Sequence, residues 1–433
     1  MKRIFILSLL ALASAFSVEA PARELVRGAA FMDLIEPISP LGQLSSDLWG
    51  AAAVVPRYPD IGLEDNTYSY WGGNIVKGDD GKYHMFVARW REDISRPNGK
   101  SGHELWWASE VAHAVSDDPM GRYEVIDVIG AGHNPEVYRL NDGTYVLGVM
   151  GDKAYVASTI NGPWRRITTS FNESRKMNHT NRTYVVRKDG SVLMMNKEGY
   201  TYTCPADEIE RFTLVDVEPA YRRRNGSHEE DPVIWRDEVC YNLIVNECLG
   251  RKAYHLTSPD GYHWSYEDGL AYTPEIAIRK DGTREDWHKF ERPKILTDEY
   301  GRATHINFAA ADTLKHCDVA LDNHSSKNMV FKLKVPFRVE LIELSGDNVK
   351  VKILAEEGFN PQKDIKIKTM RFGASSKVNY GGGMRVVNST PDGADLIVVF
   401  GREEHGLIEE DYKAKILGEG KGGDFVIGYV KLK

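Results

Sequence analysis

Five segments of the sequence share one layout, and this repeat restricts the possible folds more than any other feature. Each segment has a polar opening, an alternating run, a short turn and a second apolar run. Asp-Gly turns between alternating runs predict β-hairpins, because glycine accepts a positive φ without strain. The five segments are Trp71–Trp90, Asn134–Gly151, Asn181–Glu198, Asp231–Glu247 and Glu291–Ala311.

The spacing of the turns indicates the size of the repeating unit. The turn residues Gly81, Gly143, Gly190, Glu238 and Gly301 are separated by 62, 47, 48 and 63 positions. Units of about 50 residues with four strands each are typical of β-propeller blades. Few stretches have a helical period. We therefore predict an all-β chain built around a five-bladed β-propeller, with an irregular β-sandwich as the alternative.

The two ends of the chain lie outside the repeat. Residues 1–20 combine a basic start, an apolar run and small residues, Val18 and Ala20, at the −3 and −1 positions of a cleavage site, which is the pattern of a signal peptide. The apolar run is shorter than the roughly 20 residues of a membrane span. We assign 1–20 to a signal peptide, 21–329 to the propeller and 330–433 to a small C-terminal β-sandwich-like domain. We expect an exported protein, periplasmic or secreted, without membrane insertion.

Composition and missing motifs exclude several classes of function. A net charge of −8 gives no electrostatic reason to bind nucleic acid. The chain has no nucleophile elbow, Walker loop, HExxH motif or dinucleotide fingerprint. Its cysteines fit neither a zinc nor a redox spacing, and buried free thiols are favoured over a Cys240–Cys248 bond. We expect no cofactor. Whether a structural divalent cation occupies the propeller channel is left open.

The polar openings of the segments predict a ligand pocket. In a propeller the first strand of each blade lines the central channel, so the opening residues of all blades surround one mouth. Converging hydrophilic groups at such a mouth are suited to binding a ligand. The predicted substrate-binding residues are Asn74, His133, Asn134, Glu136, His179, Arg182, Glu230 and Arg292.

Carboxylates and a histidine in two openings are the candidates for catalysis. Asp231 follows another acid and precedes Pro232, which should keep the backbone of Asp231 extended. Carboxylates buried near one another acquire a raised pKa, as a general acid requires. Glu291 opens the fifth segment, and His288 can donate a proton because histidine titrates near neutrality. Glycoside hydrolysis needs two such groups across a sugar ring.

The openings NPEV, EDPVIW and FERPKI resemble those of five-bladed propeller glycosidases, chiefly glycoside hydrolase families 43 and 117. The resemblance covers roughly residues 45–330 and is somewhat greater to family 117. It implies Asp231 as a catalytic carboxylate and His288 as the acid. Both families have a base Asp at the first inner strand, where this sequence has Asn74. An amide cannot act as a base, so Asp65 is the candidate replacement.

We therefore expect an exo-acting glycoside hydrolase for a plant or algal poly- or oligosaccharide. The resemblance implies an inverting mechanism, with carboxyl groups about 6.5–9.5 Å apart. Two other interpretations remain. The first is a non-catalytic carbohydrate-binding propeller, which Asn74 favours. The second is a polysaccharide lyase, in which His179 or His288 removes a proton. Arg182 or Arg292 would then neutralise an acidic sugar.

Overall fold

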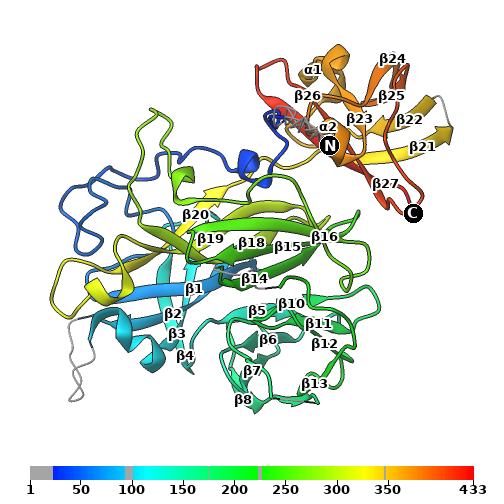
Figure 1. Cartoon of the computed structure of the whole chain (residues 1–433). Coiled ribbons are helices and arrows are strands. Elements are labelled where there is room, and N and C mark those ends of the chain that lie inside the picture. Colours follow the sequence, from blue (N-terminus) through cyan, green and yellow to red (C-terminus); the bar gives the residue numbers. More distant parts are fainter. Residues whose placement is uncertain (1–22, 93–100, 175, 223–226, 346–347) are drawn as a thin grey trace, which may run out of the picture.

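The computed structural model describes residues 23–92, 101–174, 176–222, 227–345 and 348–433. Within these ranges the chain folds into a propeller followed by a C-terminal sheet (Figure 1). The predicted signal peptide, residues 1–20, lies outside the described residues. None of the helices in the described ranges is long and apolar enough to span a membrane.

Five sheets of mainly antiparallel strands form the blades of the propeller. Blade one contains β1 (Tyr68–Lys77), β2 (Tyr83–Arg91), β3 (Glu110–Ser116) and β4 (Glu124–Ala131). Blade two contains β5 (Glu136–Arg139), β6 (Tyr145–Gly148), β7 (Lys153–Ala157) and β8 (Arg165–Thr168). Blade three contains β10 (Thr183–Val186), β11 (Val192–Met195), β12 (Thr201–Cys204), β13 (Arg211–Leu214) and, parallel to β13, β9 (Ser170–Asn172). Blade four contains β14 (Glu229–Arg236), β15 (Tyr241–Glu247), β16 (Lys252–Ser258) and β17 (Ser265–Tyr266). Blade five contains β18 (Lys289–Thr297), β19 (Ala303–Ala311) and β20 (Ser326–Lys332).

The predicted hairpins are the first hairpins of the five blades. The turn residues Gly81, Gly143, Gly190, Glu238 and Gly301 each lie between the first two strands of a blade. All four glycines among them have a positive φ, between 79° and 92°, as the turn chemistry requires. The prediction of an all-β chain with a five-bladed propeller is therefore confirmed.

The C-terminal part is one seven-stranded sheet that curls nearly closed on itself. Along the sheet the order is β21-β22-β25-β24-β23-β26-β27. Its strands are β21 (Val339–Ser345), β22 (Asn348–Ile353), β23 (Arg371–Gly373), β24 (Met384–Asp392), β25 (Asp395–Gly401), β26 (Lys413–Glu419) and β27 (Phe425–Lys431). The expected sandwich-like domain thus takes the form of a single curled sheet. The boundary expected at 329 falls inside β20, and the connection occupies residues 333–338.

In the described residues, helical structure is limited to short segments of three to seven residues. These are η1 (Phe31–Leu34), η2 (Gly102–Ala108), η3 (Pro274–Ile276), η4 (Lys315–Cys317), α1 (Pro361–Asp364), η5 (Ile367–Thr369) and α2 (Ser375–Val378). Of these, η2 and η4 matter for the site, because both contribute side chains beside one mouth of the channel.

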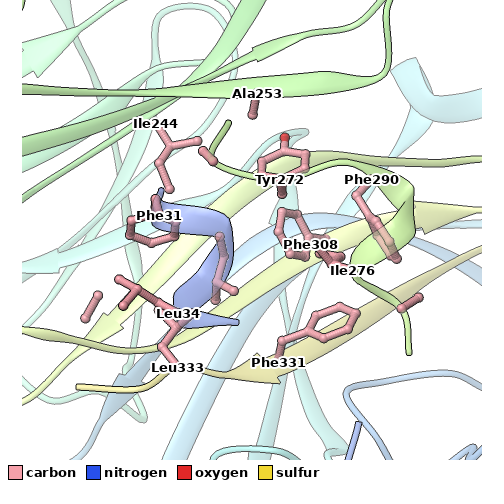
Figure 2. Packing of buried hydrophobic residues seen from close by; sticks show 14 of the residues in the cluster. Phe31, Leu34, Ile244, Ala253, Tyr272, Ile276, Phe290, Phe308, Phe331 and Leu333 are labelled. Atoms are coloured by element: carbon pink, nitrogen blue, oxygen red, sulfur yellow. The ribbon is translucent and has the colours of Figure 1, made fainter. Parts of the chain in front are cut away.

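A shared hydrophobic core joins the two parts of the chain. Phe31 of η1 belongs to one buried cluster with Tyr272, Phe290 and Phe308 of the propeller (Figure 2). The same cluster includes Phe425 of β27. Burial of large aromatic side chains contributes most of the packing energy of such a cluster. The C-terminal sheet is therefore packed against blades four and five.

The cysteines are all free thiols in the structure. Cys204 and Cys240 are buried, Cys248 is half-buried and Cys317 is exposed. The favoured interpretation, buried free thiols, thus holds for the first two, and Cys240 and Cys248 are not bonded to each other.

Candidate active site

In each blade, one residue near the start of the inner strand has a left-handed backbone conformation. Gly72, Asn134, Asn181, Asp231 and Arg292 have φ values of 62°, 52°, 53°, 57° and 52°. Register shifts mark β-bulges at this position in blades one, four and five. A bulge inserts an extra residue into one strand and re-aims its side chains. The expectation that Pro232 keeps Asp231 extended is therefore wrong, because the bulge overrides the preference that the proline imposes.

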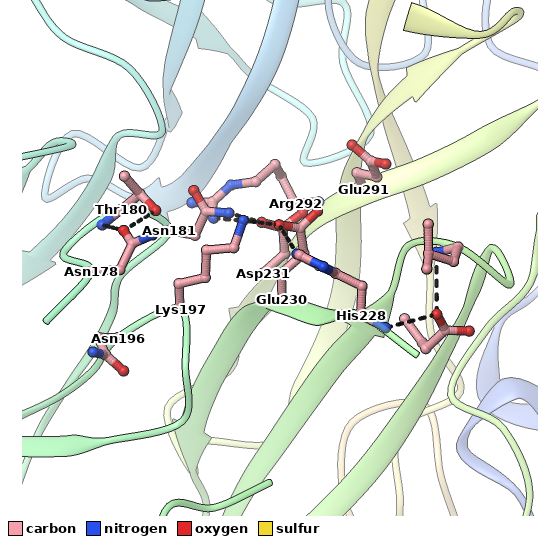
Figure 3. A network of polar contacts seen from close by, with 12 residues as sticks. Asn178, Thr180, Asn181, Asn196, Lys197, His228, Glu230, Asp231, Glu291 and Arg292 are labelled. Atoms are coloured by element: carbon pink, nitrogen blue, oxygen red, sulfur yellow. Dashed lines mark hydrogen bonds and ion pairs between the residues drawn. The ribbon is translucent and has the colours of Figure 1, made fainter. Parts of the chain in front are cut away.

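Four of these residues form a chain of hydrogen bonds that we call the channel ring: Asn134, Asn181, Asp231 and Arg292. Asn134 Nδ2 donates to Asn181 Oδ1 at 2.6 Å, and Asn181 Nδ2 donates to Asp231 Oδ1 at 2.6 Å. Arg292 donates to Asp231 through its backbone N at 3.1 Å and its guanidinium at 3.0 Å (Figure 3). In the first blade, a Cβ atom at Gly72 would lie 3.4 Å from Arg292 Cβ. The channel ring therefore connects blades two to five and reaches blade one.

The surroundings of Asp231 are suited to holding the blades together. Its side chain and that of Arg292 are only 3% and 2% exposed. Burial raises the pKa of Asp231, and the Arg292 guanidinium opposes that effect without cancelling it. Both carboxylate oxygens already accept hydrogen bonds from protein donors. The structure brings the predicted residues Asn134, Asp231 and Arg292 together, and it places them in the wall of the channel.

Glu136 links three blades further along the channel. Its Oε2 contacts Lys294 Nζ, and its Oε1 accepts hydrogen bonds from Thr183 Oγ1 at 2.9 Å and from Tyr184 N at 3.0 Å. Burial lowers the pKa of Lys294 to about 8, although Glu136 opposes the shift. Both carboxylate oxygens of Glu136 therefore have protein partners. Neither is free to accept a hydrogen bond from a substrate, which was the predicted role of Glu136.

Two glutamates occupy equivalent positions on neighbouring inner strands. Glu230 and Glu291 each precede the left-handed residue of their blade. Lys197 Nζ forms an ion pair with Glu230 Oε2, and Lys289 Nζ lies 3.0 Å from Glu291 Oε1. The two carboxyl side chains are 15% and 14% exposed. The structure therefore presents two half-buried carboxylates beside the channel ring, each with its own lysine.

The two glutamates have opposite electrostatic environments. Burial raises the pKa of Glu291, and Lys289 only partly offsets this, while the charge of Glu230 adds to it. Burial acts on Glu230 in the same direction, but Lys197 and its hydrogen bond outweigh it and lower the pKa. Glu230 is therefore the carboxylate that stays ionised, and Glu291 is the one that keeps its proton to higher pH.

Tryptophans and further cations stand beside these carboxylates. Lys289 Nζ lies 5.2 Å from the ring centre of Trp71, and Lys315 Nζ lies 5.1 Å from that of Trp106. Trp106, on η2, is half-buried and packs on His133 with ring centres 4.9 Å apart. Half-exposed indole faces are suited to stacking on sugar rings. The sequence interpretation missed Trp106, because η2 lies between β2 and β3, outside the repeated openings.

The sequence interpretation also missed both lysines. Lys197 lies in the turn between β11 and β12, far from any opening, and no local pattern marks it. Lys289 is two residues before Glu291, so the alternation of a strand could have indicated that both side chains share a face.

His288 and Asp65, two predicted catalytic residues, have other partners. Arg251 donates to the carbonyl oxygen of His288 at 2.9 Å. Burial and Arg251 lower the pKa of His288, which favours neutral imidazole rather than a proton donor. Asp65 Oδ1 accepts from the backbone N of Thr67 at 2.6 Å and of Tyr68 at 2.8 Å. Asp65 thus shapes the turn before β1.

Asn74 and His133 are bonded to neighbouring protein groups. Asn74 Nδ2 donates to the carbonyl oxygen of Val137 at 2.7 Å, and its Oδ1 accepts from Val137 N at 2.8 Å. His133 Nδ1 lies 2.9 Å from Ser109 Oγ, and burial followed by Arg292 lowers the pKa of His133. Asn74 therefore joins blade one to blade two, at the strand position where the resemblance expected a base.

His179 and Arg182 lie together between blades two and three. His179 Nε2 is 2.9 Å from Glu173 Oε2, and its ring stacks on Phe171 with centres 3.6 Å apart. The Arg182 guanidinium lies 5.3 Å from the ring centre of Phe171 and donates to the carbonyl oxygen of Val149. Arg182 is 3% exposed. The structure thus places the predicted residues His179 and Arg182 beside each other, and Arg182 is buried against other protein groups.

No family model matches the sequence, and no curated protein matches it. Similar solved structures include a family 117 glycoside hydrolase of the marine bacterium Zobellia galactanivorans, with 12% identity, a TM-score of 0.46 and coverage of 64% of this chain and 88% of that one. A family 43 β-xylosidase/α-arabinofuranosidase from a compost microbial metagenome, in complex with xylotriose, has 11% identity, a TM-score of 0.44 and coverage of 70% and 94%. The chain is thus similar to members of the two glycoside hydrolase families that its blade openings resemble.

Proposed function

We propose that this protein is a glycoside hydrolase in which Glu291 is the general acid and Glu230 the general base. One observation carries the proposal. Two glutamates from equivalent positions of neighbouring blades lie beside the same channel ring, each with its own lysine. Glycoside hydrolysis uses one protonated and one ionised carboxyl group across the scissile bond. Glu230 thus takes the role of base that the sequence interpretation gave to Asp65, and Glu291 takes the role of acid that it gave to His288.

The reaction follows from this assignment. Glu291 gives its proton to the oxygen of the leaving sugar as the glycosidic bond breaks. Glu230 removes a proton from a water molecule, and the water oxygen bonds to the anomeric carbon from the opposite face. The ion pair with Lys197 keeps Glu230 ionised before the water molecule binds. Exchange of one proton with solvent at each glutamate then restores the starting state, and the product has inverted configuration.

The channel ring supplies the rigidity that the two glutamates need. Asp231 follows Glu230 and Arg292 follows Glu291, so the Asp231–Arg292 pair connects the backbones that carry the acid and the base. Catalysis is sensitive to the separation of such groups. Asp231 and Arg292 are therefore positioning residues.

Exo action on a plant or algal poly- or oligosaccharide is a further part of the proposal. It is supported by the resemblance of the blade openings to those of the five-bladed propeller glycosidases. Trp106 of η2 offers a half-exposed ring face on which a terminal sugar can stack.

The test is a screen of wild type, Glu291→Gln and Glu230→Gln against xylo-, arabino- and algal galacto-oligosaccharides, with product analysis. Wild type should release single sugars of inverted configuration, and both variants should lose turnover. An unsaturated product that absorbs in the ultraviolet would instead identify a lyase. Binding without cleavage by the wild type would identify a carbohydrate-binding module.

Export is the second part of the proposal, supported by the basic start and apolar run of residues 1–20. Expression of the full chain in a bacterium should yield a periplasmic or secreted protein whose mass corresponds to a start at Pro21. Recovery of the uncleaved chain from the cytoplasm would contradict export.

A further inference from the structure

Three side chains with different ligand atoms gather beside the proposed base. His228, Glu230 and Cys248 each offer one ligand atom, and these atoms all lie within 4.8 Å of one another. In the part of the chain that the structure describes, this is the one group of three or more histidine, cysteine or carboxylate side chains close enough to hold a metal ion. His228 Nε2 is 3.5 Å from Glu230 Oε2.

The strand register produces this cluster. His228 and Glu230 are two residues apart, so their side chains lie on the same face of the strand. Cys248 N donates to the carbonyl oxygen of His228 at 3.1 Å, which places Cys248 directly across from His228. Glu230 pairs with Asn246 in the same ladder. The three ligand atoms are therefore brought together by the backbone.

A buried carboxylate stiffens the backbone under the cluster. Glu247 is 4% exposed, and its Oε1 accepts from His228 N at 3.2 Å and from Leu249 N at 3.2 Å. Its Oε2 accepts from Gly250 N at 2.9 Å. One side chain thus holds both segments that carry ligands, so the cluster needs little rearrangement to bind an ion.

The donor set selects the class of metal. A thiolate, an imidazole and a carboxylate suit Zn²⁺, whereas Ca²⁺ and Mg²⁺ take oxygen ligands. Three protein ligands leave a fourth tetrahedral position open, and all three side chains are partly exposed. We propose that His228, Glu230 and Cys248 form a site for Zn²⁺ or a similar transition-metal dication.

Lys197 is the group with which the metal competes. Its ammonium now forms the ion pair with Glu230 Oε2, the oxygen that also faces His228 (Figure 3). A dication bound to that oxygen repels the ammonium, so Lys197 must move away. Metal binding therefore prevents Glu230 from acting as the base. This consequence rests on the proposed function: Zn²⁺ inhibits the hydrolase, and a chelator restores activity.

Direct binding is measured on the mature full-length protein by competition with a chromophoric chelator for Zn²⁺. The wild type should bind one Zn²⁺ per chain. His228→Ala and Cys248→Ala should each weaken binding by on the order of tenfold or more. Lys197→Met should tighten it by roughly tenfold, because the competing cation is gone. Co²⁺ should produce a thiolate charge-transfer band in the wild type that is lost in Cys248→Ala.

Matched controls are the exposed residues Cys317 and His263, which belong to no such cluster. Cys317→Ala and His263→Ala should bind Zn²⁺ as the wild type does. If Cys248→Ala misfolds, Cys248→Ser tests the thiol with a smaller change. The site is refuted if Cys248→Ala or Cys248→Ser binds Zn²⁺ as tightly as the wild type, if Lys197→Met binds it more weakly, or if no thiolate band forms.

The binding and activity measurements separate the two proposals. Absence of Zn²⁺ binding with intact sugar release would refute the metal site and leave the hydrolase. Tight Zn²⁺ binding that does not slow sugar release would support the metal site and contradict the role of Glu230 as base.

Discussion

Arg292 holds Asp231 twice, donating to one carboxylate oxygen from its backbone N at 3.1 Å and to the other from its guanidinium at 3.0 Å. The two residues belong to neighbouring blades, and each directly follows one of the proposed catalytic glutamates. The separation of Glu230 and Glu291 therefore depends on an ion pair that itself takes no part in proton transfer.

Asp231→Asn is expected to lower the free energy of unfolding by about 3–5 kcal/mol, because it leaves the buried Arg292 charge unpaired. Chemical denaturation measures the loss. Adding Arg292→Met should recover most of it, since no buried charge then remains. The control is Asp79→Asn, which breaks the exposed inter-blade pair with Arg139 and should cost under about 1 kcal/mol. If Asp231→Asn is as stable as the wild type but has lost turnover, Asp231 acts in the chemistry.

Glu291→Gln is expected to reduce turnover by on the order of 10²–10⁴-fold while the protein stays folded, because an amide cannot donate the proton. Burial raises the pKa of Glu291, so activity of the wild type should fall as pH rises through that raised value. Lys289→Met removes the cation that lowers this pKa, and should move the alkaline limb to higher pH. The exposed Glu104 of η2 provides the control, as Glu104→Gln should leave the profile unchanged. An alkaline limb that does not move in Lys289→Met would contradict the assignment of the acid.

Asn74→Asp introduces the residue type that the resemblance implies for this strand, yet it is expected to destabilise the protein. The amide both donates to and accepts from Val137, and a carboxylate would face the Val137 carbonyl oxygen at the same distance. An unmade buried hydrogen bond of this kind costs about 1–3 kcal/mol. Thermal unfolding measures the change against Asn141→Asp in an exposed turn. A stable Asn74→Asp variant with raised turnover would mean that this position does belong to the chemistry.

Acid should weaken the packing between the propeller and the C-terminal sheet. Burial alone would raise the pKa of Glu267, but Lys413 of β26, 2.7 Å away, outweighs it and lowers the pKa to about 2. Because the folded pKa is below the unfolded value of about 4.3, the pair stabilises the fold above that pH. The stabilisation, on the order of 3 kcal/mol, is lost as pH falls from about 4.3 towards 2.

Denaturation midpoints measured across this pH range test the role of Glu267. Glu267→Gln should unfold more easily at neutral pH and show less change on acidification. The matched control is Glu238→Gln, because Glu238 pairs with Arg338 across the same boundary but is half-exposed, so its effect should be small. An unchanged acid response in Glu267→Gln would assign the response to other groups.

Local sequence was sufficient to predict the hairpins and therefore the blades. A turn between alternating runs depends on a few residues, with a glycine of positive φ in four of the five turns, and on the period of the next few side chains. Both can be read within about 20 residues. This is why the five segments, from Trp71 to Ala311, correspond to the first hairpins of the five blades. The same openings also predicted that polar residues gather at one mouth of the channel, because the inner strands all start there.

What the sequence could not decide was whether Glu230 or Asp231 pairs with Arg292 of the neighbouring blade. The bulges at Asp231 and Arg292 shift the register by one residue, and such a shift moves side chains to the other face of a strand. Asp231 therefore turns to Arg292, and Glu230 remains beside Lys197 and Cys248. These partners come from other strands and turns, and their proximity depends on how the blades close around the channel. The sequence determined the repeat and the polar mouth, whereas only the tertiary structure decided the burial and the partners of each carboxylate.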